Sequence, residues 1–519
     1  MDAINLIFTF RGTFMDKIKT SGKCFVDEYG RERIFSGVNI GIKNKPECMH
    51  GIDWSYDIAA LKKRGMNIIR FFTNWSKIMP TPGTYNEKEL EDIQNFLDAC
   101  EKEGVYAYLD MHQDLYGDFD VEDTGGGDGA PKWASLTDGH IYIKPKLVWA
   151  EGYFINKAVH HSFDNFWSNT YTEGKGVQDH FIDMWRMLAR RFGNHPALFG
   201  FDVLNEPFPG SDGGKVFFGL LKSIAKVTLT GKKIDKKKLL ASLTSPAPMP
   251  EILKQYDGDV LAKITESGGK YIHKFDTERY TPFLNRVAAA IRSETDNGII
   301  FMENCYYSNM GIPFSGGPIT VNGKKEENQA FAPHAYDFMV DTPLYKYADN
   351  DRVKSIFDQR RKEQNQRLNM PVLVGEWGGG STGTDWFHHV EFLLDLFDSY
   401  KWSNTYWCYN HGMYNSALMN VLCRPYPMAV CGSIDFYRFD REENAFELTF
   451  DQDREYEADT EIFAHRPVES VETDGTYTEE KLSDTTSILH IKTKPGKHTV
   501  KVHFAGQGVT YSANGRKPI

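Results

Sequence analysis

The chain has 519 residues, a net charge of −11 and a sequence pI near 5.8. This length exceeds that of one small domain and suits a large domain with a smaller partner. The acidic balance argues against nucleic acid as a partner, and no apolar run approaches the length of a membrane span. Aromatic residues make up 14% of the chain, which provides faces for stacking on sugar rings as well as core packing.

The N-terminal region predicts a β-hairpin over residues 22–39, in which short apolar runs flank a turn at residues 27–30. Such a hairpin could close the bottom of a barrel. Residues 1–20 lack the basic and long apolar regions of a signal peptide, so a cytoplasmic protein is expected. A secreted protein whose leader is absent from this chain is the alternative. The seven scattered cysteines, without metal-ligand spacing, are expected to be reduced thiols.

Strand and helix patterns alternate from residue 33 to residue 408. Strands separated by helices at this spacing pair in parallel, and eight such strands close a TIM (β/α)8 barrel. The expected strands cover residues 33–39, 67–72, 105–112, 201–206, 298–303, 330–334, 371–376 and 404–408. The expected helices cover residues 54–64, 86–103, 178–192, 279–292, 349–367 and 387–400.

Two long insertions, at about 125–175 and 211–277, follow strands on the face that carries catalytic groups in such barrels. Because long connections inside compact domains are usually functional, we interpret them as walls or a lid. The lysines between residues 232 and 238 are interpreted as a solvated helix face. After residue 425, short alternating strands and Gly- and Asp-rich turns are typical of a β-sandwich. The fold prediction is therefore α/β: a TIM barrel over residues 1–425, including the hairpin, and a β-sandwich domain over residues 426–519.

Two of the expected barrel strands end on a glutamate. Glu206 follows Asn205 and precedes Pro207, which cannot donate a hydrogen bond within a sheet and so marks the strand's end. Glu376 precedes a Trp-Gly pair in the same arrangement. Either glutamate alone fits an ordinary strand–loop junction. Two of them across a barrel mouth are what a retaining glycosidase needs, one as acid/base and one as nucleophile.

Further polar and aromatic residues end the neighbouring strands. Arg70 is placed to hold a carboxylate in its charged form, with a purely structural salt bridge as the alternative. His112 and His334 also lie at strand ends, and Tyr336 could donate a hydrogen bond to the nucleophile. Trp407 could form the floor under a sugar or belong to the core.

Other chemistries lack their sequence signals. No tight His/Glu pair at metal-ligand spacing, no glycine-rich phosphate loop at a strand–helix junction and no serine nucleophile elbow occurs. No metal and no cofactor are therefore expected.

In this order, Arg70, His112, Asn205-Glu206, His334-x-Tyr336, Glu376 and Trp407 resemble the motif residues of glycoside hydrolase family five, a retaining TIM-barrel family of clan A. Its endoglycoceramidase or glycosylceramidase-like branch is similar in several longer segments, which cover residues 110–114, 129–134, 205–210, 424–427 and 429–432. The resemblance implies Glu206 as acid/base and Glu376 as nucleophile. It also implies sugar contacts from Lys43, Asp114 and residues 37–39.

We therefore expect a retaining β-glycosidase that cleaves the linkage between a glycan and a lipid such as ceramide. The alternatives are an exo-acting β-glucosidase on glucosylceramide or other apolar glucosides, an endo-β-1,4-glucanase and a non-catalytic carbohydrate-binding barrel. Expected partners are the glycolipid or glycoside and, transiently, lipid aggregates, whereas the oligomeric state stays open. Residues that could line an apolar groove for the lipid, or form the insertion's own core, are Trp133, Phe154, Phe208, Phe217, Phe218, Leu220 and Leu221.

Overall fold

Eight parallel strands form the largest sheet in the computed structural model of the chain, which describes residues 15–41, 52–119, 127–146, 149–231, 233–242, 249–342, 344–380 and 383–512. Phe331 pairs with Val372 across the two end strands, which closes the sheet into a barrel. The predicted TIM barrel is confirmed. In spatial order, its strands are β13 (Gln329–Phe331), β10 (Ile299–Met302), β9 (Leu198–Asp202), β6 (Tyr106–His112), β5 (Ile68–Asn74), β4 (Ser36–Ile40), β15 (Ser403–Tyr409) and β14 (Leu373–Val374).

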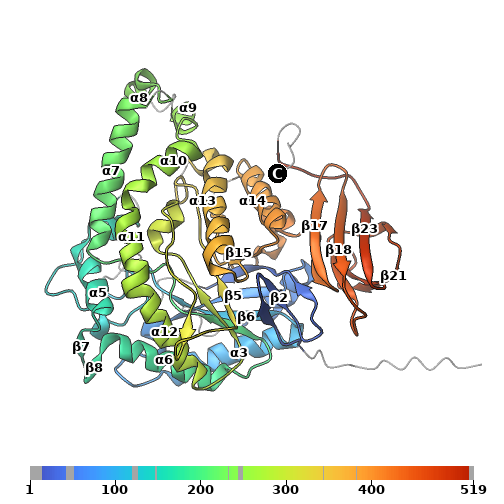
Figure 1. Ribbon diagram of the computed structural model, residues 1–519, viewed down its shortest axis with the longest axis horizontal. Coiled ribbons are helices and arrows are strands. Elements are labelled where there is room, and N and C mark those ends of the chain that lie inside the picture. Colours follow the sequence, from blue (N-terminus) through green and yellow to red (C-terminus); the bar gives the residue numbers. More distant parts are fainter. Residues whose placement is uncertain are drawn as a thin grey trace, which may run out of the picture.

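Helices surround these strands (Figure 1). Each buries an apolar face: α6 (Val177–Phe192), for example, buries Phe181, Trp185 and Leu188, which recur at helical spacing. The helix α3 (Glu87–Glu103) ends at Gly104, whose φ of 66° suits a residue without a Cβ atom. The other predicted barrel helices are α1 (Ser55–Lys63), α12 (Thr281–Arg292), α13 (Asn350–Glu363) and α14 (Phe387–Tyr400).

Both insertions consist largely of helices. The first contains α4 (Glu151–Ile155) and α5 (Lys157–Trp167), and the second begins with the long helix α7 (Asp212–Thr230). Figure 1 shows α7 rising along the left margin of the molecule to α8 (Lys236–Ser242) at the top. The lysines of α8 are exposed, as the interpretation of a solvated helix face requires. The remaining helices of the second insertion are α9 (Met249–Leu253), α10 (Gly258–Thr265) and α11 (Gly269–Phe275).

The C-terminal strands form two facing antiparallel sheets, as expected for a β-sandwich. Along β18, alternate residues point inward, so that Phe446, Leu448 and Phe450 join the core between the sheets. One sheet contains β17 (Ser433–Asp440), β18 (Ala445–Gln452), β23 (Gly496–Phe504) and β20 (Val468–Glu472). The other contains β16 (Tyr426–Val430), β19 (Thr460–Ala464), β22 (Ser487–Lys492) and β21 (Thr476–Lys481).

The N-terminal hairpin connects the barrel with this second sheet. Its strands β1 (Lys19–Ser21), β2 (Cys24–Val26) and β3 (Glu32–Arg33) extend the sheet, because β3 pairs with β16. At the same time, Phe25 packs on Phe35 and Phe199 in the apolar cluster at the first residues of the barrel strands. The hairpin therefore lies under the barrel, as expected, and also joins the C-terminal strands. The boundary near residue 425 stays a prediction.

Two expectations from composition can be compared with the described residues. Cys100, Cys305, Cys423 and Cys431 are buried thiols outside any disulfide, in line with the expected reduced cysteines. None of the described helices has both the length and the apolar character that crossing a bilayer requires.

Candidate active site

Glu206 lies beyond the end of its strand. The strand β9 ends at Asp202, four residues earlier than predicted, although residues 203–206 remain buried. Glu206 has a φ of 42°, which is uncommon for a residue with a side chain, and its N–H donates to Glu303 Oε2 at 2.7 Å. This turn directs the Glu206 carboxyl group into the barrel mouth.

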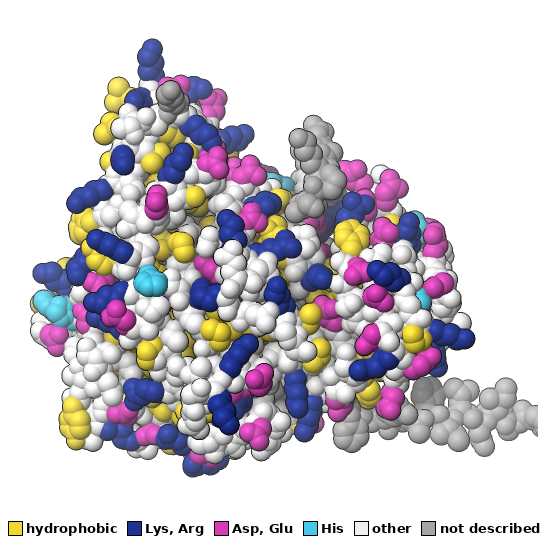
Figure 2. All heavy atoms as spheres, viewed as in Figure 1, with side chains coloured by type: hydrophobic (Ala, Val, Ile, Leu, Met, Phe, Trp, Pro, Cys, Tyr) yellow, Lys and Arg dark blue, Asp and Glu magenta, His cyan; other side chains and the backbone are white. Residues whose placement is uncertain are grey.

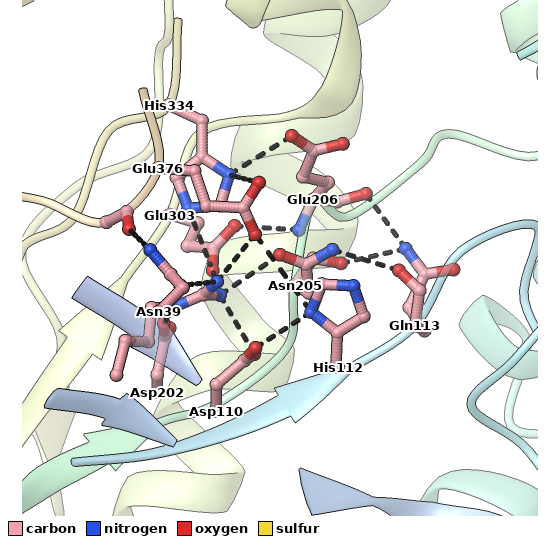
Figure 3. A network of polar contacts seen from close by, with 12 residues as sticks. Asn39, Asp110, His112, Gln113, Asp202, Asn205, Glu206, Glu303, His334 and Glu376 are labelled. Carbon is pink, nitrogen blue, oxygen red and sulfur yellow. Dashed lines mark hydrogen bonds and ion pairs between the residues drawn. The ribbon is translucent and has the colours of Figure 1, made fainter. Parts of the chain in front are cut away.

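The carboxyl groups of Glu206 and Glu376 lie close together. One oxygen of each lies within 4.8 Å of the other, with a ring nitrogen of His334 in the same space. Figure 3 shows His334 beside both glutamates. Retaining glycosidases place the two carboxyl groups about 5–5.5 Å apart, whereas inverting enzymes separate them by roughly 6.5–9.5 Å to accommodate a water molecule. The spacing fits the retaining geometry.

Arg70, on β5, donates a hydrogen bond to Glu376. Its Nη1 donates to Glu376 Oε1 at 2.6 Å, and the whole side chain is buried. Three more carboxylates surround the same guanidinium, at 2.7–2.8 Å, from Asp110, Asp202 and Glu303. Burial disfavours the charge of Arg70, but these four carboxylates raise its pKa well above the ordinary value. Arg70 therefore stays charged and keeps Glu376 fixed.

Four carboxylates around one guanidinium leave an excess of negative charge, which protonation can relieve. Burial, reinforced by the charge of Asp110, raises the pKa of Asp202 to about 6 against the pull of Arg70. Burial and the charge of Asp202 raise the pKa of Glu303 well above its ordinary range. Both shifts favour the protonated forms of these two groups, which lowers the negative charge around Arg70.

Asp202→Asn is expected to change how stability depends on pH. The pKa of Asp202 is higher in the folded protein (about 6) than its ordinary 3.8, so its protonated form stabilises the fold at low pH. That contribution, about 3 kcal/mol, is lost as the pH rises from 4 to 7. Asn keeps an oxygen for Arg70 Nε but does not titrate. Urea unfolding at several pH values should show wild type losing stability relative to the variant over this range, and a constant difference would contradict the assignment.

His334 and Asn309 both contact the same oxygen of Glu206. His334 Nδ1 lies 3.1 Å from Glu206 Oε1, and Asn309 Nδ2 donates to it at 2.6 Å. Burial lowers the pKa of His334 to about 3, so the ring is neutral and has a single N–H. Asn309 belongs to the short 3-10 helix η4 (Tyr306–Met310) after β10. The two side chains fix the orientation of the Glu206 carboxyl group.

Asn309→Ala is expected to lower kcat on a substrate with a poor leaving group by roughly tenfold to a hundredfold, because an acid that is out of position protonates poorly. A dinitrophenyl glycoside, which needs little protonation, should be affected much less. Steady-state kinetics on both substrates checks this. Replacement of the exposed Asn420 by Ala is the matched control. A similar loss on both substrates would indicate a structural role for Asn309.

The second oxygen of Glu376 has its own donor. Tyr336 Oη donates to Glu376 Oε2 at 2.9 Å, as the sequence suggested. His112 Nδ1 lies 2.8 Å from Asp110 Oδ2, and its ring stacks on Trp407 with ring centres 5.3 Å apart. Asn205 Oδ1 accepts from Arg70 Nη2 at 3.0 Å. Of the residues singled out in the sequence, the structure brings together Arg70, His112, Asp114, Asn205, Glu206, His334, Tyr336, Glu376 and Trp407, whereas Lys43 lies outside the described residues.

A cavity of about 260 Å³ opens above the two glutamates. Asp114 and Trp407 are among its lining residues. Apolar side chains complete the wall, among them Trp149 and Phe154 from the first insertion and Phe338 from the loop after β13. The first insertion therefore does form a wall of the site. The second contributes no described lining residue, but the ring of Phe217 stacks on that of Phe154 from behind.

The expected groove residues divide into three groups. Phe154 lines the cavity and Phe217 supports it. Phe208 and Leu220 are buried in the large hydrophobic core that they share with the barrel, and Trp133 packs on Trp75 outside the cavity lining. Phe218 and Leu221 are exposed.

Several functional residues were missed in the sequence. Asp202 and Glu303 each occur near the end of an otherwise apolar strand, and that isolated charge was their only signal. Asn309, Trp149 and Phe338 lie outside the α-helices and strands. No periodic pattern in these segments indicates where they lie relative to the glutamates.

A TIM barrel with two facing glutamates at the carboxyl ends of its strands defines a glycoside hydrolase of the retaining type. Residues 26–412 match cellulase (glycosyl hydrolase family 5), and residues 424–502 match the family's C-terminal domain. The chain belongs to glycosyl hydrolase family 5.

The relatives found carry a more specific description. The chain is 28% identical over 467 residues to an endoglycoceramidase of Cyanea nozakii, covering 82% of this chain and 79% of that protein. It is 24% identical over 471 residues to an endoglycoceramidase of Hydra vulgaris, covering 82% and 76%. The solved structure of endo-glycoceramidase II from Rhodococcus sp. in a ganglioside GM3 complex aligns with a TM-score of 0.71 at 22% identity, covering 94% of this chain and 100% of that one.

Proposed function

We propose that this protein is a retaining endoglycoceramidase-like β-glycosidase, which hydrolyses the β-linkage between a glycan and the ceramide of a glycolipid. The observation that carries the proposal is the pair of glutamate carboxyl groups, within 4.8 Å of each other, in a cavity that is also lined by apolar and aromatic side chains. The endoglycoceramidase of Cyanea nozakii, similar over most of its length, supports the choice of substrate.

In the first step, Glu376 acts as the nucleophile. Arg70 and Tyr336 donate to its two oxygens, which fixes the carboxyl group for attack on the anomeric carbon. Glu206 gives its proton to the glycosidic oxygen as the bond to ceramide breaks. Ceramide leaves as the alcohol, and the glycan stays bound to Glu376 as an ester.

In the second step, Glu206 removes a proton from a water molecule that attacks the anomeric carbon. The ester bond to Glu376 breaks, and the glycan leaves with its original β-configuration. His334 and Asn309 keep the Glu206 carboxyl group in place through both steps. Both carboxyl groups are thereby restored.

The glycan is bound by polar and aromatic groups around the two glutamates, for which we propose Lys43, His112, Asp114, Asn205 and Trp407. The aromatic rings of Trp149, Phe154 and Phe338 line the part of the cavity that the lipid enters in this proposal. A neutral sugar–lipid substrate agrees with the acidic balance of the chain, and no nucleic-acid partner is proposed.

Product analysis tests this function. The protein is incubated with lactosylceramide and glucosylceramide in detergent, with Glu376→Gln as the inactive control, and the products are separated by mass. Intact lactose together with ceramide is the expected result, and proton NMR should show the β-anomer first. Cleavage of glucosylceramide alone would favour the exo-acting alternative. Hydrolysis of aryl glycosides without either glycolipid would overturn the lipid assignment.

A further inference from the structure

The outward side of α7 is unusually apolar for an exposed helix. Phe218, Leu221, Ile224 and Leu229 have exposed fractions of 58%, 44%, 38% and 67%. On an α-helix these four positions fall within a sector of about 140°. The opposite side of the helix buries Val216 and Leu220 against the rest of the insertion. The exposed sector is thus a second apolar face, in addition to the one that holds α7 on the protein.

Positive charge borders this face. Lys222 and Lys226 follow one edge of the apolar sector, and neither makes an ion pair with a described acidic residue. Residues 212–242 contain eight lysines and two aspartates in a chain whose net charge is −11, although Lys233 and Lys238 pair with acidic residues between 251 and 259. Figure 2 shows dark blue and yellow side chains together along the left and upper margin, where Figure 1 draws α7 and α8.

The apolar face is continuous with the active site. Phe154 lines the cavity above the glutamates, and the ring of Phe217 stacks on it with centres 4.6 Å apart. The ring centre of Phe218 lies 5.8 Å from that of Phe217, and the Phe218 side chain is exposed to solvent. Ile155, with 63% of its surface exposed, follows Phe154 in the chain. Aromatic rings therefore lead from the cavity to the exposed side of α7.

We propose that α7 and α8 form a docking arm that binds the surface of an anionic lipid bilayer, in which the substrate is embedded. This inference rests on the proposed function. Apolar side chains bordered by lysines are typical of helices that lie in the membrane interface, where the apolar face enters the acyl boundary and lysines meet phosphate groups. A second copy of the chain fits less well, because the lysines that border the apolar faces of the two arms would be brought together and repel each other.

Vesicle binding without any glycolipid tests the arm independently of catalysis. Wild type should sediment with vesicles in which about a third of the lipid is phosphatidylserine, bind phosphatidylcholine vesicles weakly, and dissociate as salt increases. The combined change Phe218→Ser, Ile224→Ser and Leu229→Ser, and separately Lys222→Glu with Lys226→Glu, should each weaken binding by about tenfold or more.

Matched control variants change exposed residues elsewhere. Phe436→Ser with Tyr477→Ser removes two exposed aromatic side chains from the C-terminal sheets, and Lys324→Glu with Lys325→Glu makes the same change in charge. These controls should bind like wild type. The proposal is overturned if wild type does not bind the anionic vesicles, or if control and arm variants lose binding equally. Circular dichroism of each variant verifies that it is folded.

Activity then separates this proposal from the proposed function. The residues changed in the arm variants do not line the cavity, so these variants should hydrolyse glycosylceramide in detergent micelles at the wild-type rate. They should be slower on the same lipid in anionic vesicles. Vesicle binding without hydrolysis of any glycolipid would refute the proposed function but would still support the docking arm. Hydrolysis in vesicles at equal rates by wild type and arm variants would refute the arm alone.

Discussion

Glu376→Gln is expected to abolish glycosyl-enzyme formation on every substrate, with a loss in kcat of at least about 10⁴-fold. A neutral amide is a poor nucleophile, and its NH2 group would face one of the two donors, from Arg70 and Tyr336, that contact Glu376. Rapid mixing with a dinitrophenyl glycoside measures the effect, because the variant should show neither a burst of the released phenol nor a trapped ester by mass spectrometry.

Glu206→Gln should give a different pattern. Loss of the acid should reduce kcat on a glycolipid by about 10²- to 10⁴-fold, because an alkoxide leaves poorly without protonation. On the dinitrophenyl glycoside the first step should proceed almost normally, and the glycosyl-enzyme should accumulate since no base activates water. Glu443→Gln, at an exposed position in the turn between β17 and β18, is the control for an isosteric change. Equal losses on both substrates for both catalytic variants would contradict the two assignments.

The two glutamates could be found in the sequence because each stands where a strand pattern meets a chain breaker. Glu206 precedes Pro207, and Glu376 is followed by Trp377 and then by three glycines. The barrel helices were predictable for a similar reason. The helix α14, for example, has the bounds that its apolar periodicity indicated, residues 387–400. Apolar periodicity and chain-breaking Pro and Gly residues are local properties of the sequence, so these predictions needed no knowledge of distant contacts.

Features that depend on distant contacts could not be predicted. Arg33 pairs with Ala429, and no local pattern in either segment indicates that the hairpin strands join the C-terminal sheet. Glu303 is recognisable as a site residue only once Arg70 is seen beside it. The helix α7 was not predicted because apolar residues occur on both of its sides, which hides the amphipathic period.

Arg70→Met is expected to be the most destabilising single change in the site. It removes the only described Arg or Lys side chain in direct contact with the buried carboxyl groups of Asp110, Asp202, Glu303 and Glu376. Removing one partner of a buried ion pair costs about 3–5 kcal/mol, because the remaining charge stays out of water without compensation. Activity should fall with it, since Glu376 loses the donor at 2.6 Å. Arg70→Lys should restore little, because one ammonium cannot replace a guanidinium that bonds on all sides.

The pH dependence of this loss distinguishes an electrostatic cause from poor packing. Burial already raises the pKa values of Asp202 and Glu303, and without Arg70 both should hold their protons to still higher pH. A carboxyl group whose pKa is higher in the folded protein stabilises it at low pH and loses this contribution as the pH rises. The destabilisation of Arg70→Met should therefore be smaller at pH 5 than at pH 8, as measured by urea unfolding. Arg352→Met, which breaks a buried pair with Asp337 alone, is the matched control. If both variants lose the same free energy at both pH values, the cluster around Arg70 does not act through its charge.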